Sequence, residues 1–137
     1  MEQQLKPGSS FTVFLIDPHT KAIHRTLNQP GIYSVGRKSS SKRSSVEIET
    51  NDGYMSGEHF SIIISNKLLV TVKDNGSANG THFYNPQLKQ FLKLRKGEEV
   101  IIDSLERVKA GQTEITIKVL SERKPESRSG QTELIIK

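Results

Sequence analysis

Hydrophobic and polar residues alternate along most of this chain, in short runs separated by turns. In residues 11–16, Phe11, Val13 and Leu15 share one face of an extended segment, and Ile115 and Ile117 do the same in residues 113–120. No stretch shows a sustained helical period of apolar residues. The alternation predicts about ten strands, at residues 11–16, 21–27, 32–35, 46–49, 59–65, 68–73, 81–85, 89–94, 100–102 and 113–120.

Turn residues separate these runs at regular spacing. Asp17-Pro18-His19-Thr20 follows the first run, so residues 11–16 and 21–27 are expected to form a hairpin. Because each short strand has one face to bury, the pattern predicts an all-β, antiparallel β-sandwich rather than βαβ units.

The length of 137 residues allows one domain and two tails. We expect a lead-in over residues 1–8, the sandwich over residues 9–120, and a polar linker with a strand-like tail over residues 121–137. The tail is unusual because residues 128–137 repeat residues 109–118 almost verbatim.

The composition excludes several classes of protein. The chain has no cysteine, so disulfides, thiolate zinc sites and cysteine nucleophiles are excluded. The N-terminus lacks the apolar core of a signal peptide, and no apolar run approaches the roughly 18 residues of a membrane span. We therefore expect a cytoplasmic protein with no membrane contact and no cofactor.

The formal net charge of +5, from 20 Lys plus Arg against 15 Asp plus Glu, suits an anionic partner. A phosphopeptide, a nucleic acid and an anionic surface all fit that charge. Nucleic acid is the less favoured partner, because the basic residues are dispersed and the sequence shows no aromatic stacking platform.

Residues 74–81, Asp-Asn-Gly-Ser-Ala-Asn-Gly-Thr, form a polar loop between two predicted strands. Its glycine and asparagine residues tolerate positive φ, which indicates a loop whose backbone needs such conformations. A hairpin with Asn79-Gly80 as its tight turn is the simpler interpretation. The alternative is a binding loop that shares one end of the sandwich with two other polar turns, Gly36-Arg37 and residues 56–59.

Three residues in these turns have chemistry suited to a phosphopeptide. Arg37 offers a planar guanidinium fork to a phosphate, and Ser56 offers a hydroxyl donor. The amide of Asn79 can both donate to and accept from a peptide backbone. For His59 we expect a structural role, with its imidazole holding the Ser56 turn. Taken singly, Arg37 also fits a solvated surface residue, and Ser56 an ordinary turn residue.

Taken together, Gly36-Arg37, Ser56-x-x-His59 and Ser77-x-Asn79-Gly80-Thr81 resemble the forkhead-associated (FHA) domain. Residues 94–102, Leu-Arg-Lys-Gly-Glu-Glu-Val-Ile-Ile, are similar to that family's stretch before its final strands. The resemblance covers roughly residues 9–120. It implies an eleven-stranded sandwich that binds phosphothreonine peptides, with Arg37 and Ser56 on the phosphate and Asn79 on the peptide backbone. Gly36, His59 and Gly80 would shape the loops.

The chain departs from the family pattern in two places. Gly57 stands where many members carry Arg or Asn, and Ala78 stands where many carry Thr. Each change removes a side chain that would touch the phosphate or the peptide. The basic segment over residues 38–45 offers Lys38, Lys42 and Arg43 as replacement charges, and Gly57 remains an auxiliary contact to the phosphate.

These departures leave an alternative open, in which an FHA-like fold binds partners or a second copy of itself without phosphate. The tail gives this a concrete form, because residues 132–137 repeat a native strand and can add to a sheet edge. The tail also carries Thr132 with Ile135 three residues later, a spacing that resembles the ligands of some family members.

An enzyme is the least favoured class. Ser56, His59 and Asp74 contain the residue types of a hydrolase triad. However, the chain has no Gly-x-Ser-x-Gly elbow or other oxyanion element to accompany them.

Overall fold

The structure is a computed structural model, and it describes residues 11–39 and 44–121. These residues form eleven strands and no helix: β1 (Phe11–Ile16), β2 (Ile23–Leu27), β3 (Gly31–Arg37), β4 (Val46–Ile48), β5 (Phe60–Ile64), β6 (Val70–Asp74), β7 (Thr81–Asn85), β8 (Gln90–Lys93), β9 (Glu99–Ile102), β10 (Leu105–Ala110) and β11 (Thr113–Ser121). The predicted all-β sandwich is confirmed.

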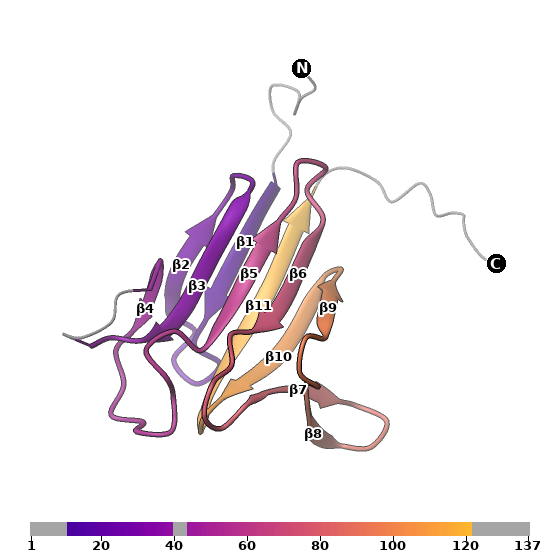
Figure 1. Cartoon of the computed structure of the whole chain (residues 1–137). Helices are drawn as coiled ribbons and strands as arrows, with labels where there is room; N and C mark the ends of the chain where they lie inside the picture. The colour runs from indigo at the N-terminus through magenta and orange to yellow at the C-terminus, as the bar shows by residue number, and fades with distance from the viewer. Residues whose placement is uncertain (1–10, 40–43, 122–137) are drawn as a thin grey trace.

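The strands make two sheets packed face to face (Figure 1). The six-stranded sheet has the order β2-β1-β11-β10-β7-β8, and the five-stranded sheet has the order β4-β3-β5-β6-β9. Neighbouring strands are antiparallel except β3 and β4, which run parallel. The predicted hairpin of the first two strands is confirmed by the antiparallel pairing of β1 with β2.

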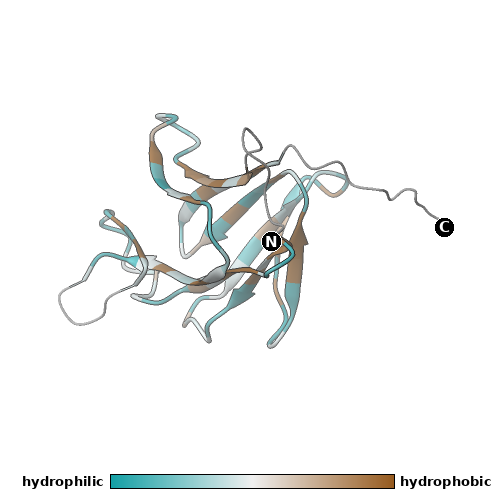
Figure 2. Cartoon of the chain, turned by 90° about the horizontal axis from the view of Figure 1, so that it is seen from above, coloured by the Kyte–Doolittle hydropathy of each residue, from teal (hydrophilic) through white to brown (hydrophobic). Residues whose placement is uncertain are grey.

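The core lies between the sheets and follows the alternation read from the sequence. In β1 and β11 the predicted inward residues are buried, and Val13, Leu15, Ile115 and Ile117 are all 0% exposed. Seen from above, the strands carry both hydrophobic and hydrophilic stretches, and the connecting loops are mostly hydrophilic (Figure 2). Burial of one face of each strand is therefore the main force holding the two sheets together.

Three predicted strands begin later than expected, for one physical reason. Lys21, Leu68 and Lys89 have φ of 67°, 64° and 56°, so each lies in a turn rather than in a strand. The structure also adds β10, which the pattern did not reveal. In β10 only Val108 and Ala110 are buried, so its apolar alternation is weak.

The chain topology brings distant loops to one end of the sandwich. In Figure 1 the loops that follow β3, β4 and β6 lie at the end opposite to the start of β1 and the end of β11. The strands flanking residues 75–80 belong to different sheets, β6 to the five-stranded sheet and β7 to the six-stranded one. Residues 74–81 are thus a crossing between sheets, and the hairpin interpretation is wrong.

The lead-in and most of the tail, including Thr132 and Ile135, lie outside the described residues. Self-association through the tail is not supported. The described residues contain no helix with the length and hydrophobicity needed to cross a membrane.

Candidate functional site

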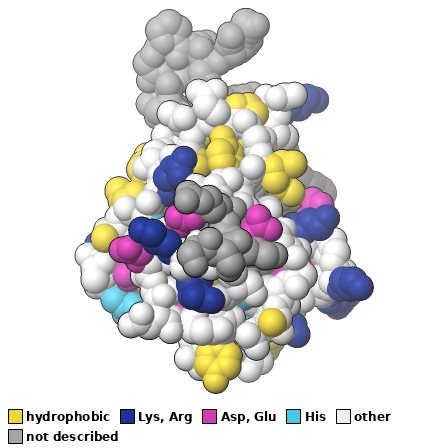
Figure 3. All heavy atoms as spheres, turned by 60° about the vertical axis from the view of Figure 1, so that its left-hand side comes forward, with side chains coloured by type: hydrophobic (Ala, Val, Ile, Leu, Met, Phe, Trp, Pro, Cys, Tyr) yellow, Lys and Arg dark blue, Asp and Glu magenta, His cyan; other side chains and the backbone are white. Residues whose placement is uncertain are grey.

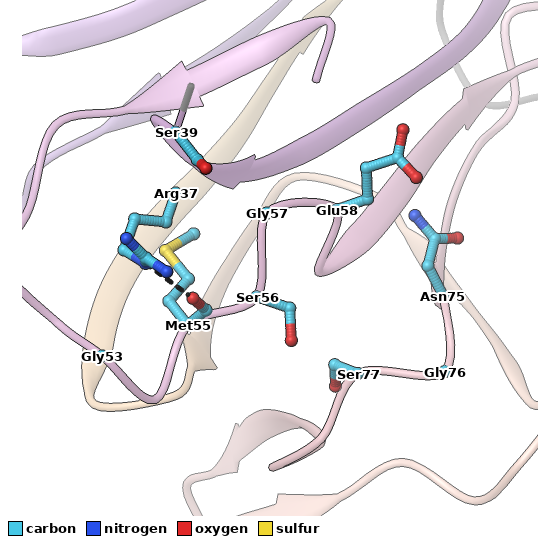
Figure 4. A pocket seen from close by; sticks show the side chains of 10 residues that line it. All are labelled: Arg37, Ser39, Gly53, Met55, Ser56, Gly57, Glu58, Asn75, Gly76 and Ser77. Atoms are coloured by element: carbon cyan, nitrogen blue, oxygen red, sulfur yellow. Dashed lines mark hydrogen bonds between the residues drawn. The ribbon is translucent and has the colours of Figure 1, made fainter. Parts of the chain in front are cut away.

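A polar pocket of about 440 Å³ opens at the loop end of the sandwich. It is lined by residues from three separate loops, among them Arg37, Ser56, Gly57 and Ser77 (Figure 4). The structure therefore brings two of the predicted phosphate-binding residues, Arg37 and Ser56, to the same cavity. Its lining includes hydroxyl, amide, backbone and guanidinium groups and the carboxylate of Glu58, which suits a hydrated polar ligand better than an apolar one.

Arg37 is the last residue of β3, and two hydrogen bonds fix it in place. Its backbone N–H donates to the carbonyl oxygen of Ser56 at 3.0 Å. Its side-chain Nε donates to the carbonyl oxygen of Met55 at 3.0 Å, the contact drawn as a dashed line in Figure 4. Met55 is 1% exposed and serves as a rigid acceptor. The two terminal nitrogens of the guanidinium have no partner among the described residues, so they remain available for a ligand.

Ser56 faces the pocket with its hydroxyl group (Figure 4). The oxygen of this hydroxyl accepts a long hydrogen bond, 3.4 Å, from the backbone N–H of Ala78. The O–H itself has no acceptor among the residues that the structure describes. Ser56 thus has one free donor on the side of the pocket next to Arg37.

His59 lies beneath the pocket and joins two of its loops. The ring is 0% exposed. Its Nδ1 accepts from the backbone N–H of Ser56 at 2.9 Å, and its Nε2 contacts the carbonyl oxygen of Gly80 at 2.7 Å. Because a carbonyl only accepts, Nε2 carries the proton and the imidazole is neutral. The imidazole therefore sets the positions of Ser56 and Gly80 relative to each other.

Gly36 allows two backbone segments to approach very closely. A Cβ at this position would lie 1.9 Å from the carbonyl oxygen of Gly57, far inside any real contact. The same carbonyl accepts a hydrogen bond from the hydroxyl of Ser44. Gly80 is required for a different reason, since its φ of +83° lies in the left-handed region.

The carboxylate of Asp74 organises the loop over residues 75–80. It accepts from the backbone N–H groups of Gly76 and Ser77 at 2.8 and 3.0 Å, and from the hydroxyls of Ser77 and Thr81 at 2.6 Å each. Desolvation by burial raises the pKa of Asp74, but the hydrogen bonds from Ser77 and Thr81 outweigh it, so the pKa is lowered overall. Asp74 therefore stays ionised and holds the loop closed on itself.

Asp52 is a second organising carboxylate, and the sequence analysis missed it. It accepts from the backbone N–H of Tyr54 at 2.9 Å, and from the backbone N–H of Gln112 and the hydroxyl of Thr113 at 2.7 Å each. These bonds connect the loop after β4 to the β10–β11 turn. Because Gln112 lies 60 residues from Asp52 in the chain, no local pattern indicates the pairing.

Asn79 does not line the pocket. It is exposed, and its Nδ2 donates to the carbonyl oxygen of Tyr54 at 2.9 Å, on the loop that supplies Met55 and Ser56. The amide oxygen and the second amide hydrogen have no partner among the described residues. Asn79 therefore lies beside the pocket, with one acceptor and one donor still unused.

Of the three auxiliary basic residues, the structure describes only Lys38. Lys38 forms an ion pair with Glu49 at 3.2 Å, and both side chains are well exposed. Lys42 and Arg43 lie outside the described residues. On the face drawn in Figure 3, basic and acidic side chains lie next to each other rather than forming one positive patch.

The geometry excludes a hydrolase triad of Ser56, His59 and Asp74. The imidazole contacts the backbone N–H of Ser56 and not its hydroxyl, and its other nitrogen is engaged by Gly80. The Asp74 carboxylate contacts Ser77 and Thr81 instead of the imidazole. The part of the chain in the structure also holds no cluster of three or more His, Cys, Asp or Glu residues that would bind a metal ion.

The fold and the pocket define a β-sandwich that carries a polar pocket on its loops. The FHA domain family matches residues 33–103, which is just over half of the chain. The chain belongs to the FHA domain family. Members of this family are interaction modules rather than enzymes, and they generally bind phosphothreonine peptides.

Solved structures show the same fold. The FHA domain of CT664 from Chlamydia trachomatis has a TM-score of 0.57 and 22% identity, over 84% of this chain and 100% of that one. The N-terminal FHA domain of Rad53p from S. cerevisiae, solved with a phosphothreonine peptide, has a TM-score of 0.58 and 16% identity, over 82% and 94% of the two chains. An FHA domain from Arabidopsis thaliana has a TM-score of 0.56 and 19% identity, over 85% and 89%. No curated protein matches the chain.

Proposed function

We propose that this chain is a phosphothreonine-dependent peptide-binding module that mediates phosphorylation-dependent protein–protein interaction. In this proposal Arg37 and Ser56 hold the phosphate and Asn79 holds the peptide backbone. The observation that carries it is the polar pocket, where Arg37 and Ser56 present unused donors to the same open cavity.

The chemistry of a phosphate fits these donors. A phosphothreonine carries a charge of about −1.5 to −2 and three acceptor oxygens. The free nitrogens of Arg37 form a planar fork that matches two of these oxygens. Since the Nε of Arg37 is already held by Met55, the fork is positioned before the ligand arrives. This reduces the entropy lost when the phosphate binds.

The two departures from the family pattern are compatible with this role. Gly57 lines the pocket and is proposed as an auxiliary contact through its backbone, because it has no side chain to offer. At Ala78 the backbone N–H already contacts the hydroxyl of Ser56, so this residue positions that hydroxyl without a polar side chain of its own.

Lys38, Lys42 and Arg43 are proposed as auxiliary phosphate contacts. Lys38 is the weakest of the three because Glu49 already neutralises it. Reversing the charge at Lys42 and Arg43 is expected to lower phosphopeptide affinity at low salt, where surface electrostatics are least screened. Unchanged affinity in a low-salt titration would show that this loop is only a solvated turn.

An oriented phosphothreonine peptide library, screened against the purified full chain, tests the proposal. We expect selective retention of phosphorylated peptides by the parent protein and by an Arg95→Ala control, whose arginine is exposed on a turn between β8 and β9. We expect none by Arg37→Ala. A library that binds equally with and without phosphate would overturn the proposal.

A second candidate function is self-association without phosphate, favoured by the outer face of the five-stranded sheet. One cross-strand row on that face consists of Ile32, Ile63, Thr71 and Ile101. Ile32 is 72% exposed and Ile101 is 53% exposed, and with the half-buried Ile63 they make this row apolar. Lys73 and Glu99 pair beside this row, so two copies related by a two-fold axis would match apolar and charged groups. Under this candidate Ile32→Lys lowers the mass measured by analytical ultracentrifugation, and a monomeric parent excludes it.

A further inference from the structure

The two lysines Lys93 and Lys109 lie beside the loop that carries Asn79. In the six-stranded sheet, Lys109 of β10 is paired with His82 of β7, and His82 is paired with Lys93 of β8. The three residues form one row across three strands, here called the cationic row. All three project from the outer face, because their sequence neighbours Thr81, Leu94, Val108 and Ala110 are buried.

The cationic row is next to the candidate binding loop. A Cβ at Gly80 would lie 2.5 Å from Cε of Lys93, so the stem of this lysine crosses directly over Gly80. His82 follows Thr81, whose hydroxyl belongs to the Asp74 network that closes the same loop. A peptide that contacts Asn79 therefore has its flanking residues within reach of Lys93.

The charges of the cationic row are not neutralised within the described residues. Glu114 lies opposite Lys109 in the strand register, but its two carboxylate oxygens are engaged by Arg107 at 2.7 and 3.3 Å. Lys93 is exposed, and no carboxylate in the described residues contacts either lysine. Lys109 lies over the ring of Phe91, with 5.3 Å between Nζ and the ring centroid. This contact fixes the position of the charge without cancelling it.

His82 reports the same positive environment. Burial lowers the pKa of His82, and the nearby charges of Lys93 and Lys109 lower it further. The imidazole is therefore neutral at physiological pH, and the charge of the row comes from the two lysines. Two unpaired cations on either side of His82, beside a loop that is proposed to bind peptide, fit a negatively charged group.

We propose that the partner of this domain carries acidic or phosphorylated residues beside its phosphothreonine, and that these residues bind the cationic row of Lys93 and Lys109. The proposal rests on the function proposed above and adds a second contact to the same ligand. It makes recognition bipartite: the pocket binds the phosphothreonine, and the cationic row selects among phosphothreonine sequences by their flanking charge.

Single-stranded nucleic acid is the other anionic ligand, and the aromatic residues argue against it. Tyr84 and Phe91 lie together, with ring centroids 5.3 Å apart in an edge-to-face arrangement. However, the guanidinium of Arg107 lies over the Tyr84 ring at 4.1 Å and covers the face on which a base would stack. The row therefore offers charge without a free stacking surface, which suits carboxylate or phosphate groups on a peptide.

The test uses one phosphothreonine peptide taken from the library screen and resynthesised with different flanking segments. The segments are neutral Gly-Ser, acidic Asp-Glu, or phosphoserine, each placed on either side of the phosphothreonine at varied spacing. At low salt we expect an acidic or phosphorylated segment to raise affinity about three- to tenfold over the neutral one on at least one side, since each exposed ion pair contributes modestly. The comparison of Asp-Glu with phosphoserine identifies which source of negative charge the row prefers.

The matched variants are Lys93→Glu and Lys109→Glu, with Lys118→Glu as the control. Lys118 is exposed on the same face of the same sheet, but it pairs with Phe14 and Leu105, farther from the loop. Each row variant is expected to remove the gain from the acidic segment while keeping affinity for the neutral peptide. The Lys118→Glu control is expected to keep both.

The outcomes separate this proposal from the function on which it depends. If no phosphothreonine peptide binds at all, the proposed function fails. If the neutral peptide binds and acidic segments give no gain, only the cationic row is refuted. A third outcome would refute the acidic-peptide ligand and assign the row to nucleic acid. In that outcome a labelled single-stranded oligonucleotide binds the parent protein more tightly than the acidic phosphopeptide does, and the Lys93→Glu variant binds the oligonucleotide more weakly.

Discussion

His59 and Arg37 lie in the same set of loops, yet their hydrogen-bonding groups are used in opposite ways. His59 is fully buried and engages both ring nitrogens within the protein. Arg37 engages only its Nε and directs the rest of its guanidinium to an open pocket. The imidazole therefore holds the loops in place, and the terminal nitrogens of the guanidinium stay free for the ligand that we propose.

The other polar residues at this end of the sandwich also fall into two sets, those with all their hydrogen-bonding groups engaged and those with unused groups. Asp74 has several partners within its own loop, and Asp52 connects two loops, whereas Ser56 and Asn79 keep unused groups. Groups whose hydrogen bonds are all made within the protein contribute to stability, because removing one leaves its buried partners unpaired. Groups with unused donors or acceptors contribute little to folding and are expected to matter for binding. Substitutions in the two sets should therefore separate stability from affinity.

The largest effect is expected for His59→Ala. The change leaves the Ser56 N–H and the Gly80 carbonyl without a partner and opens a cavity, which together cost about 4 kcal/mol of unfolding free energy. Urea denaturation of the full chain measures this cost. The exposed His19 is the matched control, and His19→Ala is expected to keep the parent's stability. Equal stability of the two variants would contradict a structural role for His59.

Arg37→Ala should have the next largest effect, mainly on binding, because only the Nε of its side chain bonds within the described residues. Loss of charge-assisted hydrogen bonds to the phosphate costs about 1.5 to 3 kcal/mol, which is at least tenfold in affinity. Isothermal titration with a phosphothreonine peptide measures the affinity, and thermal denaturation measures the stability. A large fall in melting temperature would show that Arg37 has a structural role rather than a ligand-binding one.

Asp74→Asn is expected to reduce stability by about 1 kcal/mol at neutral pH, because a neutral amide cannot accept all four hydrogen bonds. The effect depends on pH. The pKa values of Asp74 and Asp52 are lowered in the folded protein, so their stabilisation is complete above the ordinary carboxyl pKa. It is lost as the pH falls through the lowered values, below about pH 4. Urea midpoints measured across this range should fall less steeply for Asp74→Asn than for the parent.

The smallest of these effects is expected for Ser56→Ala. Its hydroxyl accepts only one long hydrogen bond, so the variant should fold with nearly the parent's stability. The loss of one donor to the phosphate should reduce peptide affinity about fivefold. Titration of Ser56→Ala beside Arg37→Ala checks the order of the two effects. A greater loss for Ser56→Ala would mean that the hydroxyl, and not the guanidinium, makes the main phosphate contact.

The sequence predicted the sandwich because alternation of apolar residues is a local signal, present within each strand. It also predicted the turns that carry Arg37 and Ser56, because their residue types and spacing resemble a known family. It did not reveal Asp52, whose partners are about 60 residues away, or the open amide of Asn79 beside rather than inside the pocket. Strand β10 was missed because its apolar alternation is weak: Leu105 is exposed, and Glu106 shares the inward side of the strand with Val108 and Ala110.

The cationic row also could not be predicted from the local sequence. Lys93 and Lys109 belong to separate strands, and nothing in their local sequence places them beside Gly80. Only the pairing of β7 with β8 and β10 brings them together. Composition predicted an anionic partner, whereas the strand register places two of the positive charges on one edge of the site.

The most direct measurement is a calorimetric titration of the full chain with one peptide in two forms, with threonine and with phosphothreonine. The account predicts that only the phosphorylated form binds, and that this binding falls at least tenfold in Arg37→Ala. Equal affinity for the two forms, or binding that Arg37→Ala leaves unchanged, would contradict it.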